Sequence, residues 1–300
     1  MSKNFTNEPE GLETHKEGNK VPKLVQRLII FFIGIPVVLA IVILPYFNHL
    51  PFSALVVLFS FLAALELNNM LSHNGKTVSR NLLLVLCPLL PVAAYICGLF
   101  DFNFILVDMV FILDVMIVFA YEVFLSKNFE DSNTKIANAV LVLVYCGLLP
   151  SFITRLTVLD NASIIICIFF IFVFISDSAA WLFGMTLGKN NRGLIKASPN
   201  KSIAGFIGAY LGTLLAAVLI KFVFWKEIFS DVSLLKMILL SVCVTTSSII
   251  GDLAESVFKR SSGFKDSGNI ILGRGGALDS IDSILASAPF FYIFTKEKNN

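Results

Sequence analysis

The sequence has few charged residues. Asp, Glu, Lys and Arg make up only 15% of the chain, whereas 56% of it is hydrophobic; soluble domains carry about 25% charged residues. This composition excludes an ordinary soluble domain and indicates an integral membrane protein. The net charge is only +2, and no basic run is interleaved with aromatic side chains, so we expect no nucleic-acid partner.

Histidine and paired cysteine are also scarce. The three histidines, His15, His49 and His73, lie in the N-terminal tail or in short loops, which excludes a His-rich metal site and a Ser-His-Asp triad. The five cysteines lie in apolar segments without CxxC spacing, so we expect small buried side chains rather than a disulfide or zinc framework. The apolar run after Arg27 is too long for a signal-peptide core and lacks a small-residue cleavage site, so it predicts a retained first span.

Long apolar stretches dominate the rest of the chain. A membrane-spanning helix needs about 20 mostly apolar residues, and backbone polar groups in lipid must be satisfied within the segment. We therefore predict an all-helical bundle of about nine transmembrane helices, at residues 28–46, 51–71, 81–100, 104–125, 136–156, 162–187, 203–225, 233–257 and 277–295. The last stretch gives the weakest signal, because Asp279 and Asp282 lie at its start.

The basic residues are distributed unevenly over the connections between these stretches. With the N-terminus in the cytoplasm, most of the 23 Lys and Arg residues fall on the cytoplasmic side, in line with the positive-inside rule. The chain then divides into a polar tail (1–27), N-terminal transmembrane helices (28–156) and a C-terminal transmembrane region that we expect to hold the functional site (157–300). The two polar loops of that region, 188–202 and 258–276, both face the cytoplasm in this orientation.

A polar stripe follows the eighth stretch. Its side chains recur at spacings of three and four, which places them on one face of a helix; they are Thr245, Ser248, Asp252, Glu255, Ser256 and Lys259. A charge within a span costs about 2.5 to 3.5 kcal/mol on insertion scales, so such residues usually face a cavity, a partner or an ion. The alternative is a helix-end cluster that reaches toward the membrane surface, with Glu255 and Lys259 as an ordinary i, i+4 pair.

Five carboxylates gather near the predicted cytoplasmic ends of three helices. They are Asp177, Asp252, Glu255, Asp279 and Asp282. Carboxylates this close repel one another, and a hard cation would offset that repulsion. Mg²⁺ prefers carboxylate and water oxygens together with substrate phosphates.

The loop between the last two acid pairs carries the opposite charge. Its bases and glycines are Lys259, Arg260, Lys265, Arg274, Gly273, Gly275 and Gly276. Glycines allow close backbone approach, and backbone amide nests bind anions, so this loop suits phosphate binding. The alternative is a plain turn.

The loop at 188–202 offers a second anion site. We place Ser198 as an N-cap with Pro199 at the first helical position, so that a helix N-terminus faces the cytoplasm and favours an anion. Lys201 then stands in the first turn. The alternative is a positive-inside retention signal beside a normal cap. Four other acids, Glu66, Asp108, Asp114 and Glu122, are scattered through the spans; we interpret Glu66 and Glu122 as membrane-interface or helix-pairing residues.

The stretch GDLAESVFKRSSGFKDSGNIILGRGGALDSIDS resembles the C-terminal signature of the phosphatidate cytidylyltransferases, also called CDP-diacylglycerol synthases. That signature runs approximately S-x-x-K-R-x4-K-D-x-G-x3-P-G-H-G-G-x-x-D-R-x-D, and the matching positions are Ser256, Lys259, Arg260, Lys265, Asp266, Gly268, Gly273, Gly275, Gly276, Asp279 and Asp282. The stretches SDSAAWLFGMTLGK and SPNKSIAGFIGA also resemble the family's D-x-x-A-Y-x-x-G and S-P-K-K-T-x-E-G motifs. The resemblance covers most of the chain from about residue 25.

Several positions depart from the family pattern. Arg274 stands where the family has His, Ser280 where it has Arg and Ala204 where it has Glu, while Leu272 replaces Pro and Trp181 and Ser202 are milder changes. The metal-type carboxylates are retained. The departures fall on polar residues that would tune or position substrate.

The resemblance implies the reaction of CTP with phosphatidate to give CDP-diacylglycerol and pyrophosphate, with Mg²⁺ and with room for a second cation. It implies that Asp177, Asp252, Asp279 and Asp282 bind metal, and that Lys259, Lys265, Asp266 and Arg274 act catalytically. It also implies substrate contacts from Ser198, Lys201, Ser202, Arg260, Gly275 and Gly276. Such a transfer needs an aligned phosphate nucleophile and cationic groups that hold the charge on the phosphates.

Two other classes of function stay open. A catalytically weakened relative that binds CTP or lipid would keep these charges and lose turnover. An ion or solute transporter also places carboxylates in spans, although its sites usually lie near the midplane in broken helices. The expected location is a bacterial-type inner membrane, with membrane lipid around the chain and the site facing the cytoplasm. A monomer and a homodimer are both open.

Overall fold

The computed structural model describes residues 30–73, 77–223, 232–271 and 275–296, and over these ranges the chain forms helices and loops without a β-strand. The predicted all-helical class is therefore confirmed. Six helical segments are long and apolar enough to cross a membrane: α3 (Leu50–Ser72), α4 (Arg80–Leu99), the continuous segment Ser132–Val158, α8 (Ala162–Thr186), α9 (Ile203–Val223) and α10 (Leu234–Ser261).

The remaining predicted spans are also helical. They form the π-helical turn η1 (Ile30–Gly34) with α2 (Ile35–Ile43), α5 (Ile105–Leu125) and α11 (Leu278–Lys296). α2 has only nine residues, and α5 carries Asp108, Asp114 and Glu122 among its apolar side chains. Each of the nine apolar stretches thus contains a described helix, while a count of nine membrane crossings stays a prediction.

The segment Ser132–Val158 is one helix with a local change of winding. It consists of α6 (Ser132–Val142), the π-helical turn η2 (Leu143–Leu148), α7 (Leu149–Arg155) and the 3₁₀ turn η3 (Leu156–Val158). Pro150 has no N–H and cannot bond the carbonyl four residues before it, that of Cys146. The hydroxyl of Ser60 in α3 donates to this carbonyl instead. The carbonyl of Cys146 is therefore satisfied at the π-helical turn. The same hydrogen bond fixes α3 against this helix.

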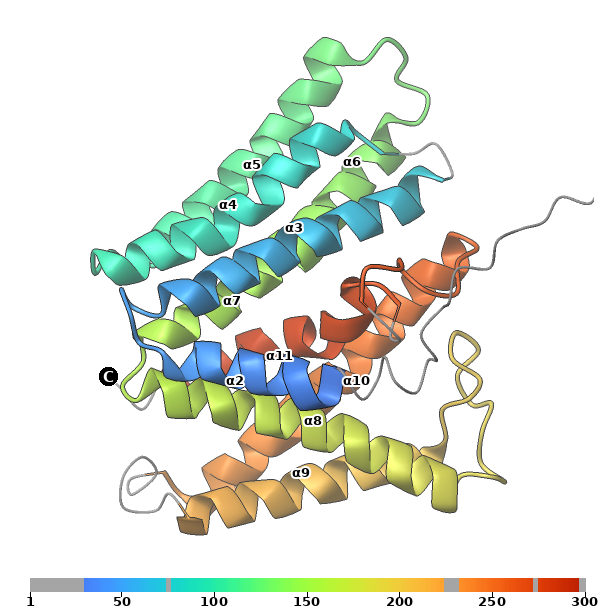
Figure 1. Ribbon diagram of the computed structural model, residues 1–300. Coiled ribbons are helices and arrows are strands. Elements are labelled where there is room, and N and C mark those ends of the chain that lie inside the picture. Colours follow the sequence, from blue (N-terminus) through green and yellow to red (C-terminus); the bar gives the residue numbers. More distant parts are fainter. Residues whose placement is uncertain (1–29, 74–76, 224–231, 272–274, 297–300) are drawn as a thin grey trace, which may run out of the picture.

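Small residues set how closely α8 and α9 approach each other. A Cβ added to Gly205 would lie 2.9 Å from the carbonyl oxygen of Ala180, and one added to Gly212 would lie 2.6 Å from the Cβ of Ala179. Gly205, Gly208 and Gly212 follow one face of α9, which is the small-residue pattern that lets membrane helices pack closely. In Figure 1 these two helices form one side of the bundle, α3 to α6 form the other, and α10 and α11 lie between them.

The buried core is aromatic as well as aliphatic. Phe169 and Phe172 of α8 and Phe291 of α11 are fully buried, and the ring centroids of Phe169 and Phe291 are 5.0 Å apart. Aromatic pairs at this separation stabilise a core beyond their buried area. The contact holds α11 against α8, which positions the N-terminal end of α11 beside the polar loops.

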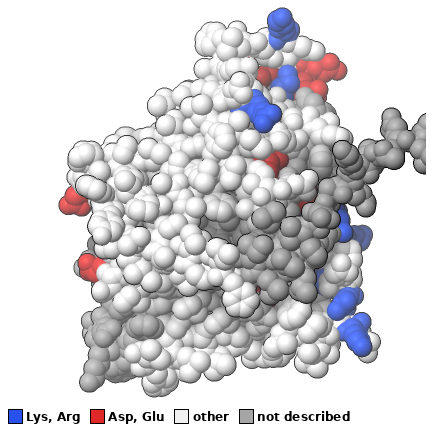
Figure 2. All heavy atoms as spheres, viewed as in Figure 1, with Lys and Arg blue, Asp and Glu red and all other residues white. Residues whose placement is uncertain are grey.

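The lateral surface is apolar. On α5 the exposed side chains Met109, Ile112, Leu113 and Met116 follow one helical face, and the face shown in Figure 2 is mostly white, with Lys and Arg along its upper and right margins. Exposed apolar surface of this extent marks contact with a membrane or partner. Together with the six apolar helices, it makes this an integral membrane protein.

Candidate functional site

The two polar loops predicted to face the same side do meet. In Figure 1 the loop after α8 and the loop between α10 and α11 lie at the same end of the bundle. Arg260 joins them: its Nε donates to the carbonyl of Ala197 in the first loop (3.4 Å), and its NH1 donates to the carbonyl of Phe264 in the second (3.3 Å). Arg260 thereby fixes the relative position of the loops, a role that leaves its predicted contact with substrate untested.

Asp279 organises the second loop. Its Oδ2 accepts from the backbone N–H groups of Ser267 and Gly276, both at 2.8 Å, and its Oδ1 accepts from Lys259. Ile271 and Gly275 exchange two backbone hydrogen bonds. A carboxylate at the first turn of α11 also suits the positive end of that helix. Asp279 therefore ties the end of α10, the loop and the start of α11 together.

Glu66 is a site residue that the sequence did not reveal. It lies on α3 and is only 2% exposed, and it accepts from the backbone N–H groups of Ala277 and Leu278, each at 2.9 Å. Its Oε2 also lies 2.8 Å from the hydroxyl of Ser267, whose single proton can be donated either to Glu66 or to Asp279, 3.0 Å away. Of the two roles expected for Glu66, the helix-pairing one is confirmed, because Glu66 joins α3 to the start of α11. Its place in the site was missed, because its partners lie about two hundred residues later in the chain.

Glycines make room for Glu66. A Cβ on Gly276 would lie 2.3 Å from Glu66 Oε2 and 1.9 Å from the Ser267 hydroxyl, and one on Gly268 would lie 2.5 Å from Glu66 Oε1. Gly275 has φ of +111°, a conformation that favours glycine. These glycines are therefore needed by the loop itself. Their predicted contacts with phosphate remain predictions.

The polar stripe on α10 divides between two neighbours. Lys259 forms ion pairs with both Glu255, four residues earlier, and Asp279, so the expected i, i+4 pair exists and extends to α11. Asp252, one turn earlier, instead pairs with Lys201 of the first loop. The five predicted carboxylates thus separate into a pair that shares Lys259 and a group around Asp252.

A cavity of about 540 Å³ lies beside Asp252. α8 contributes Asp177 and Trp181, α10 contributes Asp252, and the loop after α8 contributes Lys201, Ser202, Arg192 and Asn200. The cavity therefore brings together four predicted site residues and adds Arg192, which was not among the predicted site residues. Arg192 also donates to the carbonyl of Gly184 (3.2 Å).

The predicted helix start at Pro199 is wrong. α9 begins at Ile203, and its cap is Ser202, whose hydroxyl accepts from the backbone N–H of Gly205 (3.1 Å). The carbonyl of Pro199 accepts from Gly193 (3.0 Å), and Arg192 forms an isolated bridge with Ser202. These bonds hold the segment as a compact loop, so Lys201 precedes the helix and Ser198 caps nothing.

The other predicted residues are placed as follows. Lys265 and Asp266 are exposed on the second loop, and Arg274 lies outside the described residues. Glu122 on α5 is 3.6 Å from Lys135 of α6 and accepts from the hydroxyl of Ser132, which confirms its helix-pairing role.

The acids around Asp252 suit a cation of a particular kind. Asp282 is 8% exposed, and the negative charges of both Asp252 and Asp177 act on it. Within the described ranges, no group of three or more His, Cys, Asp or Glu side chains has the geometry of a metal site. Mg²⁺ is usually held by one or two carboxylates and completed by water and substrate phosphates, so the residues present fit Mg²⁺ of that type and do not form a preformed metal cage.

The chain is similar to known proteins of one family. A sequence model of the Cytidylyltransferase family matches residues 25–297. A phosphatidate cytidylyltransferase of Synechocystis is 28% identical over 300 residues, covering 90% of this chain and 95% of that protein. The phosphatidate cytidylyltransferase of Haemophilus influenzae is 42% identical over 125 residues, and that of Staphylococcus haemolyticus is 39% identical over 126 residues. These two alignments cover 42% and 41% of this chain and span less than half of each relative, 43% and 46%.

Proposed function

Because the chain belongs to the cytidylyltransferase family, we propose that it transfers the cytidylyl group of CTP to phosphatidate. A phosphate oxygen of phosphatidate attacks the α-phosphorus of CTP and forms the new P–O bond. The bond between the α-phosphorus and the oxygen bridging to the β-phosphorus breaks, and pyrophosphate leaves. The products are CDP-diacylglycerol and pyrophosphate.

The observation that carries this proposal is the cavity beside Asp252. A triphosphate with its cation needs both signs of charge at one place, and the cavity lining supplies Arg192 and Lys201 together with Asp177 and Asp252. Guanidinium and ammonium groups are strong donors to phosphate oxygens. When the phosphates bind, Lys201 would exchange its contact with Asp252 for one with a phosphate, which frees the carboxylate for a cation.

We place Mg²⁺ at Asp252 and Asp282, with Asp177 beside them. When bound, the ion offsets the charge that develops on the phosphates. Lys259 already balances Glu255 and Asp279, so we assign Asp279 to the loop rather than to the cation. With Asp279 assigned to the loop, the remaining acids Asp177, Asp252 and Asp282 support one cation more directly than two.

The second loop then serves the lipid phosphate and the leaving group. Lys265 is exposed on this loop, and Lys259 is fixed at its base by two carboxylates. Arg274 would clamp phosphate oxygens with its planar fork; a guanidinium stays protonated, so it does not act as an acid or base. The reaction needs no strong base, because the attacking phosphate is already anionic. Asp266 and Ser198 remain predicted contacts.

The proposed site faces the cytoplasm, where CTP is found, in a bacterial-type inner membrane. The positive-inside distribution supports this orientation. A transporter is disfavoured, because α10 runs from Leu234 to Ser261 without a break at Asp252 and because transporter sites usually lie in discontinuous helices.

Turnover by the purified protein tests the proposal. The protein in phosphatidylcholine vesicles is given labelled CTP, phosphatidate and Mg²⁺, and we expect labelled CDP-diacylglycerol that requires all three. Saturable CTP binding without any product would instead establish a catalytically weakened relative. Absence of both binding and product would refute the proposed function.

A further inference from the structure

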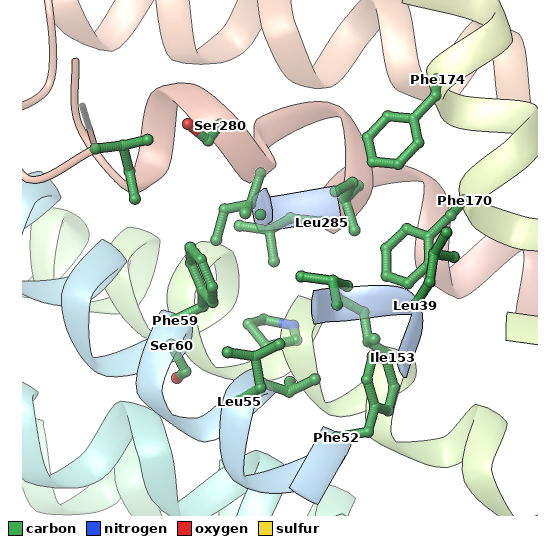
Figure 3. A pocket seen from close by; sticks show the side chains of 17 residues that line it. Leu39, Phe52, Leu55, Phe59, Ser60, Ile153, Phe170, Phe174, Ser280 and Leu285 are labelled. Atoms are coloured by element: carbon green, nitrogen blue, oxygen red, sulfur yellow. The ribbon is translucent and has the colours of Figure 1, made fainter. Parts of the chain in front are cut away.

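A second cavity lies in the apolar part of the bundle, behind the loop that Asp279 organises. It measures about 300 Å³, roughly twice an engineered apolar cavity that holds one benzene ring. Figure 3 shows Leu39 of α2, Phe52 and Phe59 of α3, Ile153 of α7, Phe170 of α8 and Leu285 of α11 around it. No site described above uses this cavity.

The lining of the cavity excludes a polar ligand. Among its 17 lining residues, which all belong to the described part of the chain, only Ser60 and Ser280 carry polar side-chain atoms. Both hydroxyls are already used, since Ser60 donates to the carbonyl of Cys146 and Ser280 donates to that of Gly276. A polar group entering the cavity would lose its bonds to water, and only these two hydroxyl oxygens could accept from it in return, which is unfavourable. The occupant must therefore be hydrocarbon.

One end of the cavity reaches the site. Ile271 and Ser280 both line it; Ile271 exchanges backbone hydrogen bonds with Gly275, and Ser280 follows Asp279. The cavity extends along α3 from Phe59 to Phe52, which are seven residues and about 10 Å apart on one helix face. Glu66, seven residues beyond Phe59 on that face, holds the start of α11. A hydrocarbon chain in the cavity would thus have its polar end at the loop.

From this continuity we propose that the cavity binds one acyl chain of the diacyl phosphate substrate. The inference rests on the proposed function for the identity of the head group. A phosphatidate seated in this way would have its phosphate beside Lys259 at the end of α10 and Lys265 on the loop, while its chain packs between α3, α8 and α11. Bilayer hydrocarbon is as apolar as the cavity wall, so the chain gains contacts and orientation rather than a large transfer free energy.

Photolabelling tests this binding without requiring turnover. The probe is a phosphatidate with a diazirine at the middle of one acyl chain, given at low mole fraction to the purified protein in phosphatidylcholine vesicles. We expect labelled peptides to include the Phe59 and Leu285 regions. Excess unlabelled dioleoyl phosphatidate should reduce that labelling at least threefold, whereas further phosphatidylcholine should not. Labelling confined to lipid-facing residues such as Ile293, or equal competition by both lipids, would overturn the proposal.

Matched variants sharpen the test. Ile284 lines the cavity and Ile293 is exposed on the same helix. Ile284→Trp should reduce cavity labelling at least threefold and raise the KM for dioleoyl phosphatidate about fivefold, while leaving the KM for dihexanoyl phosphatidate within twofold. Ile293→Trp should change neither KM. Val56→Phe, on the opposite wall, replaces Ile284→Trp if that protein does not fold, and unchanged labelling in the folded cavity variant would refute the proposal.

The proposed function and the acyl site can fail separately. Competed labelling of the cavity without CDP-diacylglycerol formation would support the site and refute the reaction. Turnover with no labelling at Phe59 or Leu285 would support the reaction and refute the site.

Discussion

Glu66 shows how a single residue on a distant helix can hold the second polar loop in place. Its carboxylate satisfies two backbone N–H groups at the start of α11 and lies within hydrogen-bond distance of Ser267. A side-chain amide has one acceptor oxygen where the carboxylate has two, so Glu66→Gln leaves at least one buried donor unsatisfied. An unsatisfied buried donor costs about 1 to 3 kcal/mol. We expect Glu66→Gln to lower thermal stability and to lower kcat/KM about tenfold.

Glu122→Gln is the matched control for this prediction. Glu122 is also buried, at 4% exposure, and it accepts from Ser132 at the α5 and α6 contact, away from the loops. We expect its amide variant to lose stability but to keep its kcat/KM. Equal kinetic effects of the two variants would mean that Glu66 acts on global stability alone.

Asp282 provides the residue-level test of the cation site. It is buried near Asp252 and Asp177, whose negative charges repel a negative charge on Asp282. Asp282→Asn removes that repulsion, so we expect higher thermal stability without Mg²⁺ and at least about a hundredfold lower turnover. Stability curves with and without Mg²⁺ and initial rates over a Mg²⁺ titration measure both effects. Asp160→Asn, an exposed control in the loop before α8, should change neither the thermal stability nor the turnover. Normal turnover of Asp282→Asn would contradict the assignment of Asp282 to the cation site.

At the scale of helices, the start of α9 depends on one hydroxyl. Ser202 caps the helix through Gly205, and losing such a cap costs about 0.5 to 2 kcal/mol. Ser202→Ala should therefore lower the unfolding temperature by a few degrees, whereas Ser198→Ala should not, because Ser198 lies in the loop before the helix. Differential scanning fluorimetry of both variants checks this. A larger drop in unfolding temperature for Ser198→Ala than for Ser202→Ala would instead support the helix start at Pro199 that the sequence predicted.

The helices could largely be predicted from the sequence, whereas the helix ends and the loops that connect them could not. Each apolar stretch forms a helix, because lipid leaves the backbone no other partner. The start of α9 was misplaced, because Ser198-Pro199 is a typical capping pair and the bond from Gly193 to Pro199 that keeps it in a loop is not visible in the local pattern.

The candidate site was predicted only in part, for the same reason. Motif spacing brought Asp252 and Lys201 into consideration, and the structure shows them in contact. Motif spacing gave no indication that Glu66 would contact Ser267. An isolated carboxylate in an apolar helix carries no local signal of a partner so distant in the chain. Sequence patterns identify which residues are chemically unusual, and the fold decides which of them meet.

For the whole molecule, the two polar loops lie at the same end of the bundle, and the proposed orientation puts that end in the cytoplasm. Lys265 is exposed on the second loop, which suits Lys265→Cys for labelling. In right-side-out membrane vesicles we expect an impermeant maleimide to modify this cysteine only after the membrane is opened. The wild-type chain, whose five cysteines are buried or half-buried, is the background control. Modification in sealed vesicles would reverse the proposed orientation.

The position of the radioactive label in CTP tests the central claim most directly. Purified protein in phosphatidylcholine vesicles is given phosphatidate, Mg²⁺ and CTP labelled with ³²P at either the α- or the γ-phosphate. Cytidylyl transfer predicts that α-label enters the lipid fraction as CDP-diacylglycerol, and that γ-label leaves in pyrophosphate, with both signals lost in Asp252→Asn. Transfer of γ-label to lipid, or lipid free of label from both nucleotides, would contradict the account.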